Sequence, residues 1–291
     1  MLKRIEREQR KDNETDVKPK APWSRCLILA SRGVSAKQRY LMQDLISMIP
    51  HNKKEPKFDD KRHFHEIAEI CDLRNCDTCI FFENRKHTDL YLWFCCAPHG
   101  PSIKFFVENI TTMSNLKLTG NALKGSRPII SFGAEFDSSN ENKIIKEILS
   151  KIFHVEQNYP KSKPFIDHIL QFSIVDDRIW MRNYQIVDGS GNEKLSLVEI
   201  GPRYCMRCIK ILSGCFSGSV VYLNEKYVSP NVIRSMERRE AQLSAARSKQ
   251  IAKEKSEEQK NIVEKKSFLD EVFDNEVKIE EDEKENKESS N

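Results

Sequence analysis

Apolar and polar residues alternate along the chain in a way that predicts a mixed α/β protein. Short apolar runs rich in β-branched and aromatic residues predict strands at RCLILAS (25–31), SIKFFVENI (102–110), RPIISF (127–132) and LSLVEI (195–200). Two longer apolar stretches, CIFFENRKHTDLYLWFCC and FIDHILQFSIVDDRIWMRNYQIV, are each interrupted by a polar turn. They predict two hairpins, turning near Arg85–Thr88 and at Asp176–Asp177.

Apolar residues spaced three and four apart predict helices between these strands. Ser35 can cap a helix to about Met48, HFHEIAEICDL predicts a short helix, and NENKIIKEILSKIF predicts a longer one capped by Ser138 or Ser139. A further helix is expected between Pro202 and Gly214, residue types that suit a helix start and end. One side of this helix would carry Cys205, Cys208, Ile209 and Leu212, and the other Arg203, Arg207 and Lys210.

The second half of the chain repeats the plan of the first. The first strands of the two halves (27–31 and 129–131) lie about 100 residues apart, as do Gly100-Pro101 and Gly201-Pro202. Each half also has a Trp in the second arm of its hairpin, Trp93 and Trp180. We therefore expect one α/β unit to be duplicated within 23–230, with halves of about 23–115 and 116–230.

The two ends of the chain differ from this duplicated region. Residues 1–22 are polar and predict a flexible arm. Residues 231–267 are rich in helix formers and poor in apolar residues, so they predict a charged helix that is solvated or docks on a partner. Residues 268–291 predict an acidic tail that is disordered alone and orders on a partner surface through Phe268, Leu269, Val272 and Phe273.

Charge is divided unevenly along the 291 residues. Residues 1–230 carry 35 Lys and Arg against 28 Asp and Glu, whereas 231–291 carry 13 against 16. A mildly basic domain favours a polyanion as partner. The sequence has no run of 18 apolar residues and no apolar signal-peptide core, so we expect no membrane association and a nuclear or cytosolic protein with reduced thiols.

Cysteine spacing raises the question of a metal site. His63, His65, Cys71, Cys76 and Cys79 offer thiolate and imidazole ligands for zinc, although their spacing matches no standard finger. Cys205 and Cys208 lie too far along the chain to complete such a site with Cys76 and Cys79. Buried free cysteine behaves as a small hydrophobe, so packing is the favoured role of both pairs and no cofactor is expected.

Signatures of catalysis are scarce. The sequence contains no P-loop, no G-x-G-x-x-G, no G-x-S-x-G and no H-E-x-x-H motif. Asp176 and Asp177 resemble a carboxylate pair but are more simply a turn, and His99 favours loop structure or a phosphate contact. A non-enzymatic protein is therefore expected.

Basic residues gather in three places that suit an anion, and the first is the side of the expected helix with Arg203, Arg207 and Lys210. Arg32, Lys37 and Arg39 lie around a helix start, where free N–H groups add positive potential. The stretch 116–132 contains no acid, and its glycines allow a close approach of the backbone to a ligand. The predicted nucleic-acid contacts are Arg32, Lys37, Arg39, Lys104, Lys117, Lys124, Ser126, Arg127, Arg203, Arg207 and Lys210.

The stretch GNALKGSRPIISF, with Lys117-Leu118-Thr119 before it, resembles the signature of the Brix-domain family of ribosome biogenesis factors. SRGVSAKQRYLMQDLISMIPHNKKE, NCDTCIFFENRKHTDLYLWF, PHGPSIKFFVENI, FIDHILQFSIVDDRIWMRNYQI and LVEIGPRY extend the resemblance in order from about Trp23 to Pro230. It implies an α/β (α+β) Brix domain of two similar halves, each like the anticodon-binding domain of class II tRNA synthetases, followed by a helical or disordered extension. The acidic tail departs from the basic end that the resemblance implies.

The resemblance further implies a nucleolar, non-enzymatic factor for the large ribosomal subunit. Such a factor would bind pre-rRNA and work with a helical assembly-factor partner on the pre-60S particle. Two alternatives remain open: a protein–protein scaffold without direct RNA contact, and an enzyme that depends on zinc or a thiol. Phosphate contacts make RNA affinity depend steeply on salt, which separates the first alternative from RNA binding.

Overall fold

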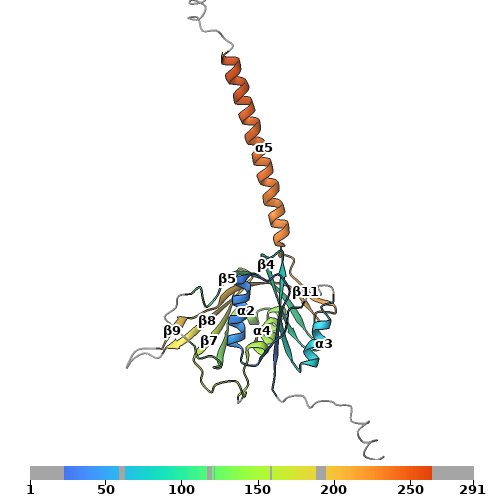
Figure 1. The fold of residues 1–291 in the computed structure, drawn as a ribbon, viewed down its shortest axis with the longest axis vertical. Coiled ribbons are helices and arrows are strands. Elements are labelled where there is room, and N and C mark those ends of the chain that lie inside the picture. Colours follow the sequence, from blue (N-terminus) through green and yellow to red (C-terminus); the bar gives the residue numbers. More distant parts are fainter. Residues whose placement is uncertain are drawn as a thin grey trace, which may run out of the picture. The chain divides into compact units, whose positions relative to one another are not determined.

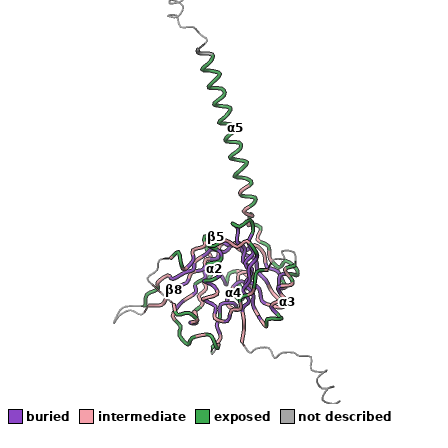
Figure 2. Tube along the Cα trace, viewed as in Figure 1, coloured by how far each residue is buried: buried purple, intermediate pink, exposed green. Residues whose placement is uncertain are grey.

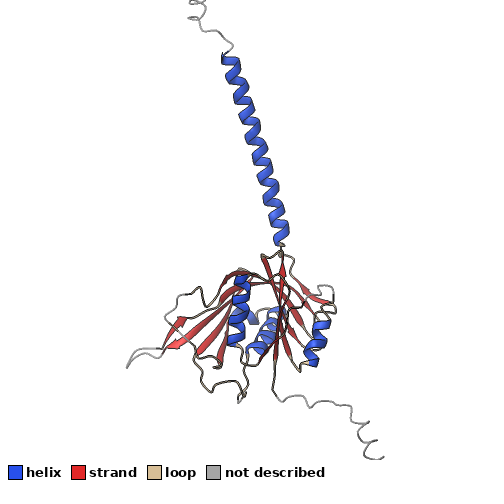
Figure 3. Ribbon diagram, viewed as in Figure 1, coloured by secondary structure: helices blue, strands red, loops and turns tan. Residues whose placement is uncertain are grey.

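A computed structural model describes residues 23–58, 63–116, 120, 122–157, 159–187 and 195–263 of the chain. The predicted arm (1–22) and the predicted acidic tail (268–291) lie outside these residues. The chain divides into two compact units, Met1–Tyr227 and Val228–Asn291. The first unit holds a mixed sheet with helices on both of its faces (Figures 1 and 3).

The described strands of the first unit form one 11-stranded sheet in the order β2-β1-β3-β4-β5-β10-β8-β7-β6, with β11 beside β10 and β9 beside β8. Their bounds are β1 Cys26–Ala30, β2 Asn52–Lys54, β3 Thr78–Arg85, β4 Asp89–Cys96, β5 Ser102–Thr111, β6 Pro128–Phe132, β7 His168–Val175, β8 Arg178–Val187, β9 Ser196–Glu199, β10 Arg203–Leu212 and β11 Val220–Leu223. Both predicted hairpins are confirmed, and Asp176 and Asp177 occupy the turn of the second at φ 52° and 57°.

The sheet order confirms the predicted duplication. Strands β1-β3-β4-β5 of the first half are matched by β6-β7-β8-β10 of the second, and the halves meet where β5 and β10 pair antiparallel. Each half starts with a strand, continues through a helix to a strand that runs parallel to the first, and then forms an antiparallel hairpin. Gly100-Pro101 precedes β5 and Gly201-Pro202 precedes β10.

Three of the four helices predicted between the strands are confirmed. Helix α2 (Ala36–Met48) begins with a capping box, in which the Ser35 hydroxyl accepts from the Gln38 N–H and the Gln38 side chain accepts from the Ser35 N–H. Helix α4 (Asn140–Phe153) is capped by Ser139, and α3 (Glu66–Leu73) is the short helix. A 3-10 turn, η1 (Ala134–Asp137), precedes α4.

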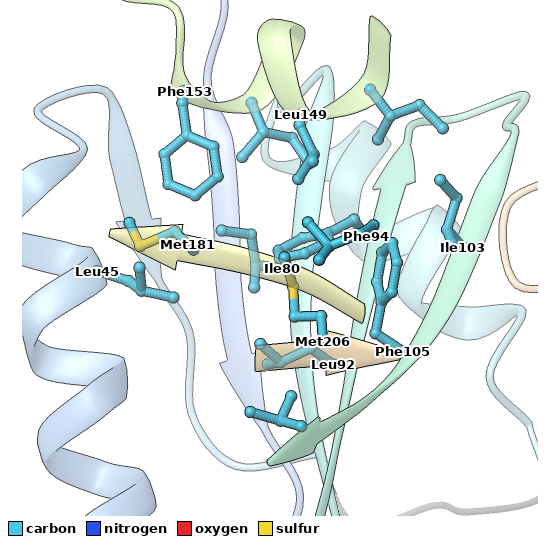
Figure 4. Close-up of a cluster of buried hydrophobic side chains, with 14 of the residues drawn as sticks. Leu45, Ile80, Leu92, Phe94, Ile103, Phe105, Leu149, Phe153, Met181 and Met206 are labelled. Atoms are coloured by element: carbon cyan, nitrogen blue, oxygen red, sulfur yellow. The ribbon is translucent and has the colours of Figure 1, made fainter. Parts of the chain in front are cut away.

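Helices α2 and α4 pack on the same face of the sheet and bury the larger core. Leu45 of α2 and Leu149 and Phe153 of α4 meet strand residues such as Ile80, Phe94, Phe105, Met181 and Met206 (Figure 4). Helix α3 lies on the opposite face, where Ile67 and Cys71 pack against Leu29, Phe81 and Trp93. Successive side chains of a strand point to opposite faces of the sheet, so one strand contributes to both cores. Ile80 and Phe82 pack in the larger core, whereas Phe81 packs in the smaller core beneath α3.

The predicted helix after Pro202 is wrong, because this segment is the central strand β10. Tyr204, Met206 and Cys208 point into the larger core, while Arg203, Cys205 and Arg207 point to the opposite face. The segment extends because its backbone pairs with β5 on one side and β8 on the other. The cysteines and arginines therefore do not form opposite sides of a helix.

In the second unit, residues Pro230–Val263 form helix α5, which is exposed along nearly its whole length (Figure 2). The charged helix predicted for 231–267 is thus present up to Val263, and 264–267 lie outside the described residues. No helix in the described ranges is long and apolar enough to cross a membrane.

Candidate nucleic-acid interface

The first predicted cluster of basic residues lies at the start of α2. Arg32, Lys37 and Arg39 are all exposed there, and the first turn of the helix contains no acid. By contrast, α3 has Glu66 and Glu69 in its first turn. The helix start therefore combines the positive end of the backbone dipole with exposed cations, an arrangement that attracts phosphate.

The loop before β6 is held by an acid from outside it. The Asp167 carboxylate accepts a hydrogen bond from the Leu123 N–H at 2.6 Å and lies 2.7 Å from Nδ1 of His168. Burial by itself would raise the pKa of Asp167, but the polar groups beside it, Ser126, His168 and the Leu123 N–H, lower it below the ordinary value. The ionised carboxylate fixes the base of the loop, while Lys124 at its tip is exposed.

Gly125 is required by the conformation of this loop. Its φ of +84° lies in the left-handed region, and its carbonyl accepts from the Lys163 N–H at 2.7 Å. Arg127 is half-buried, and one of its terminal nitrogens lies 3.5 Å from the carbonyl of Pro164. Lys117, also predicted as a contact, lies outside the described residues.

Two predicted contacts need correction because their side chains are buried. Ser126 is 1% exposed, and its hydroxyl donates to the Leu123 carbonyl at 2.7 Å, so it shapes the loop and cannot reach a phosphate. Lys104 is 7% exposed, and its ammonium lies 2.7 Å from the Glu83 carboxylate. A lysine paired inside the protein is not available to an RNA backbone.

The predicted contacts on β10 lie on the face of the sheet opposite α2 and α4. Arg203, Arg207 and Lys210 are half-buried. Arg203 lies 3.4 Å from Glu199, and the Lys210 ammonium lies 5.6 Å from the centre of the Trp93 ring. These three residues are therefore spread along one strand, on the face of the sheet that does not carry α2.

Residues of β8 on the same face were missed at the level of sequence. Arg178, Trp180 and Arg182 alternate with buried Ile179 and Met181, so they share one face of the strand. The Arg182 guanidinium lies 5.5 Å from the centre of the Trp180 ring, and Arg178 lies 3.2 Å from Glu108. The alternation in RIWMR was visible in the sequence and is the signal that could have found this group.

The cysteines serve as packing residues. All nine are free and buried, and Cys71, Cys76 and Cys79 lie together in the smaller core. Burial raises the pKa of Cys76 to about 11 and that of Cys26 to about 12, which keeps both thiols protonated at neutral pH. His63 and His65 contact each other edge to face, and no group of three or more His, Cys, Asp or Glu within the described ranges is placed to hold a metal.

A cavity of about 350 Å³ lies beneath the loop. It is lined by the loop backbone at Gly120 and Gly125, by Met48 of α2 and by Asn183 of β8. The described part of the loop therefore lies over both a helix and the sheet.

The chain is similar to known proteins over most of its length. The Brix domain model matches residues 31–210. Ribosome biogenesis protein BRX1 of Saccharomyces cerevisiae is 45% identical over 267 residues, a match that covers 87% of this chain and 92% of the yeast protein. Its Xenopus laevis homolog is 46% identical, with 82% and 70% covered, and the Homo sapiens homolog is 48% identical, with 72% and 58% covered.

Among solved structures, a probable ribosomal biogenesis protein from Aeropyrum pernix K1 superimposes with a TM-score of 0.44 at 14% identity, over 63% of this chain and 96% of that protein. The family model covers more than half of the chain, and the relatives are well over 40% identical. The chain belongs to the Brix domain family.

Proposed function

We propose that the protein is a non-enzymatic ribosome biogenesis factor that binds pre-rRNA and supports assembly of the large (60S) subunit. The observation that carries this proposal is the similarity to a yeast ribosome biogenesis protein over 92% of that protein's length. In this proposal the Brix domain spans 23–230, and the protein acts in the nucleolus on pre-60S particles.

Exposed cations support the RNA-binding part of the proposal. Arg32, Lys37 and Arg39 at the start of α2 and Lys124 in the loop are open to solvent, and both places offer backbone N–H groups or a close backbone approach. RNA backbones are held mainly by such groups through their phosphates. The remaining proposed contacts are Lys117, Arg127, Arg203, Arg207 and Lys210.

The chemistry of the described residues supports a role in binding. Asp176 and Asp177 form a hairpin turn, and Lys226 lies 2.9 Å from Asp177, so this pair of carboxylates is part of the surface structure. The thiols are buried, and burial raises the pKa values of Cys26 and Cys208. A protonated, enclosed thiol is a poor nucleophile.

Depletion of the protein in its own cells tests the assembly role. We expect free 60S subunits to fall relative to 40S subunits on a sucrose gradient, with precursors of the large-subunit rRNAs accumulating. Protein recovered after ultraviolet crosslinking should carry those precursors. Loss of 40S subunits with 60S retained, or an unchanged gradient, would contradict the proposal.

Helix α5 favours a second candidate, a scaffold that holds partner proteins without direct RNA contact. Its exposed apolar side chains, Val232, Ile233, Met236, Leu243 and Ile251, recur along the helix at spacings that put them toward one side. A helical partner could dock along that side. A scaffold of this kind would yield no crosslinked RNA after denaturing purification, whereas an RNA-binding factor would.

A further inference from the structure

The duplication allows the two halves of the sheet to be compared position by position. Trp93 pairs with Lys104, three residues after Pro101, and Trp180 pairs with Cys205, three residues after Pro202. The two tryptophans are therefore equivalent. Both point to the face of the sheet opposite α2 and α4.

The two tryptophans differ in what covers them. Trp93 is 3% exposed beneath α3 and Phe216, and its Nε1–H donates to Glu83 at 2.8 Å. Trp180 is partly exposed, and its Nε1 atom is shielded from solvent without a hydrogen-bond partner in the described part of the chain. Of the helices described in the first unit, α2, α4 and η1 pack on the other face and α3 packs on the first half. In the second half, no described helix covers this face of β7 and β8, and its residues are exposed or half-buried.

The residues around Trp180 show that this face is not an apolar surface that lacks its helix. Phe81 of β3 lies opposite Trp93, and Ser173 of β7 lies opposite Trp180. Because the two tryptophans are equivalent, Phe81 aligns with Ser173. Two residues earlier on each strand, Cys79 aligns with Gln171. The first half is apolar at these positions and the second is polar. The aligned pairs are Cys79 and Gln171, Phe81 and Ser173, Tyr91 and Arg178, and Cys95 and Arg182.

The same face has a positive charge. It carries four arginines and two glutamates. Arg178 is paired with Glu108, and Arg203 is paired with Glu199. Arg182 and Arg207 make no ion pair with any described residue. Arg207 lies two positions along β10 from Cys205, the residue opposite Trp180. Two guanidinium groups without an ion pair among the described residues therefore lie on the same face as one partly exposed indole.

We propose that this open face, defined by Gln171, Ser173, Arg178, Trp180, Arg182 and Arg207, binds single-stranded RNA. The inference rests on the proposed RNA-binding function and extends its proposed contact Arg207 into a site that includes β7 and β8. An unpaired base would stack on the Trp180 and Arg182 pair, and neighbouring phosphates would bind Arg178 and Arg207. Stacking on aromatic and guanidinium planes requires bases that are free of a duplex, so the single strand is the form that fits.

Fluorescence anisotropy with the full-length protein and a labelled single-stranded RNA of about 12 nucleotides tests the inference. The variants are Arg182→Gln with Arg207→Gln, Trp180→Leu, and Trp180→Tyr, which keeps an aromatic plane. The matched control is Arg238→Gln with Arg239→Gln, which removes two exposed arginines from α5. A duplex of the same sequence is measured in parallel, and circular dichroism checks that each variant is folded.

We expect the double arginine variant and Trp180→Leu to bind the single strand roughly tenfold more weakly, because loss of one stacked base has an effect of this size. Trp180→Tyr should keep most of the affinity, and the control and the affinity for the duplex should change little. If the double arginine variant binds the single strand as tightly as the natural protein while Lys124→Gln with Arg127→Gln weakens binding, the open face is not an RNA site and the proposed function survives. Equal losses for single strand and duplex would also overturn the inference, as would release of a bound partner protein with RNA affinity unchanged. If the natural protein binds neither RNA, both proposals fail.

Discussion

The ammonium of Lys104 lies 2.7 Å from the carboxylate of Glu83 inside the sheet, where neither side chain is more than a tenth exposed. Burial alone would raise the pKa of Glu83, but the charge of Lys104 and hydrogen bonds from Lys104 and Trp93 lower it below its ordinary value. Glu83 is therefore ionised at neutral pH, and the two charges depend on each other.

This pair predicts strong non-additivity in a double-mutant cycle. Lys104→Met should lower the free energy of unfolding by about 3–5 kcal/mol, because it leaves the Glu83 carboxylate buried without its cation. Glu83→Leu combined with Lys104→Met should cost less than the sum of the single changes. Urea unfolding of the four proteins measures both quantities, and additive effects would show that the pair is not coupled.

His51 predicts a loss of stability in mild acid. Its ring is 2% exposed, its Nε2–H donates to the Ile152 carbonyl at 3.1 Å, and its Nδ1 has no hydrogen-bond partner among the described residues. Burial lowers its pKa from 6.5 to about 4. Between these values the unfolded chain binds the proton more readily than the folded protein, so stability falls as pH decreases from about 6.5 towards 4.

The size of this effect follows from comparison with His51→Gln, which can still donate to Ile152 and does not titrate. From pH 7 to about 4.5 the natural protein should lose about 2–3 kcal/mol more than the variant. Denaturant unfolding across this range measures the difference, and parallel curves for the two proteins would contradict the prediction.

Adding a single methyl group at Gly100 should strongly lower the stability of the folded protein. The φ of Gly100 is +98°, and a Cβ atom there would lie 2.5 Å from the backbone of Gly214. Gly100→Ala should therefore destabilise the protein by at least about 2 kcal/mol. Gly133→Ala is the matched control, since φ there is −66° and the atom closest to an added Cβ belongs to the flexible Glu135 side chain. Gly133→Ala should lower the free energy of unfolding by less than about 1 kcal/mol. If both variants lower the melting temperature equally, the predicted difference between the two glycines is wrong.

Buried cysteines predict slow thiol chemistry and no structural zinc. In the folded protein the nine thiols should react with a disulfide reagent far more slowly than in denaturant, because they are enclosed and the pKa values of Cys76 and Cys26 are raised to about 11 and 12. Protein purified without added metal should hold much less than one zinc per chain. About one equivalent, lost in Cys76→Ser, would show that these residues form a metal site.

Local patterns predicted most of the fold. The capping serines, Ser35 and Ser139, and the turn at Asp176–Asp177 act through neighbours in the chain, so their elements could be found from sequence alone. Strand β10 could not be found in this way, because its extended form depends on pairing with β5, about 100 residues away. The duplication could have predicted this strand, because Gly100-Pro101 precedes the predicted strand at 102–110 and Gly201-Pro202 is the equivalent pair in the second half.

The candidate site was less predictable than the fold. Some of the residues chosen as contacts are exposed, namely Arg32, Lys37, Arg39 and Lys124. Lys104 and Ser126 are buried, and their partners are Glu83 of β3 and His168 of β7. These partners lie far away in the sequence, so the burial could not be predicted from local patterns. The open face around Trp180 becomes visible only when strand pairing aligns the halves. The two halves differ in what covers Trp93 and Trp180, and the local sequence around each Trp does not predict this coverage.

The dependence of RNA affinity on salt tests the central claim most directly. The natural protein should show a steep linear fall of log affinity with log salt concentration, and Lys117→Gln, Lys124→Gln and Arg127→Gln together should reduce the slope by about 2, because each lost phosphate contact removes roughly 0.7–0.9. Arg238→Gln with Arg239→Gln on α5 should leave the slope unchanged. An unchanged slope in the triple variant, or an equal reduction in the α5 control, would contradict RNA binding through the loop.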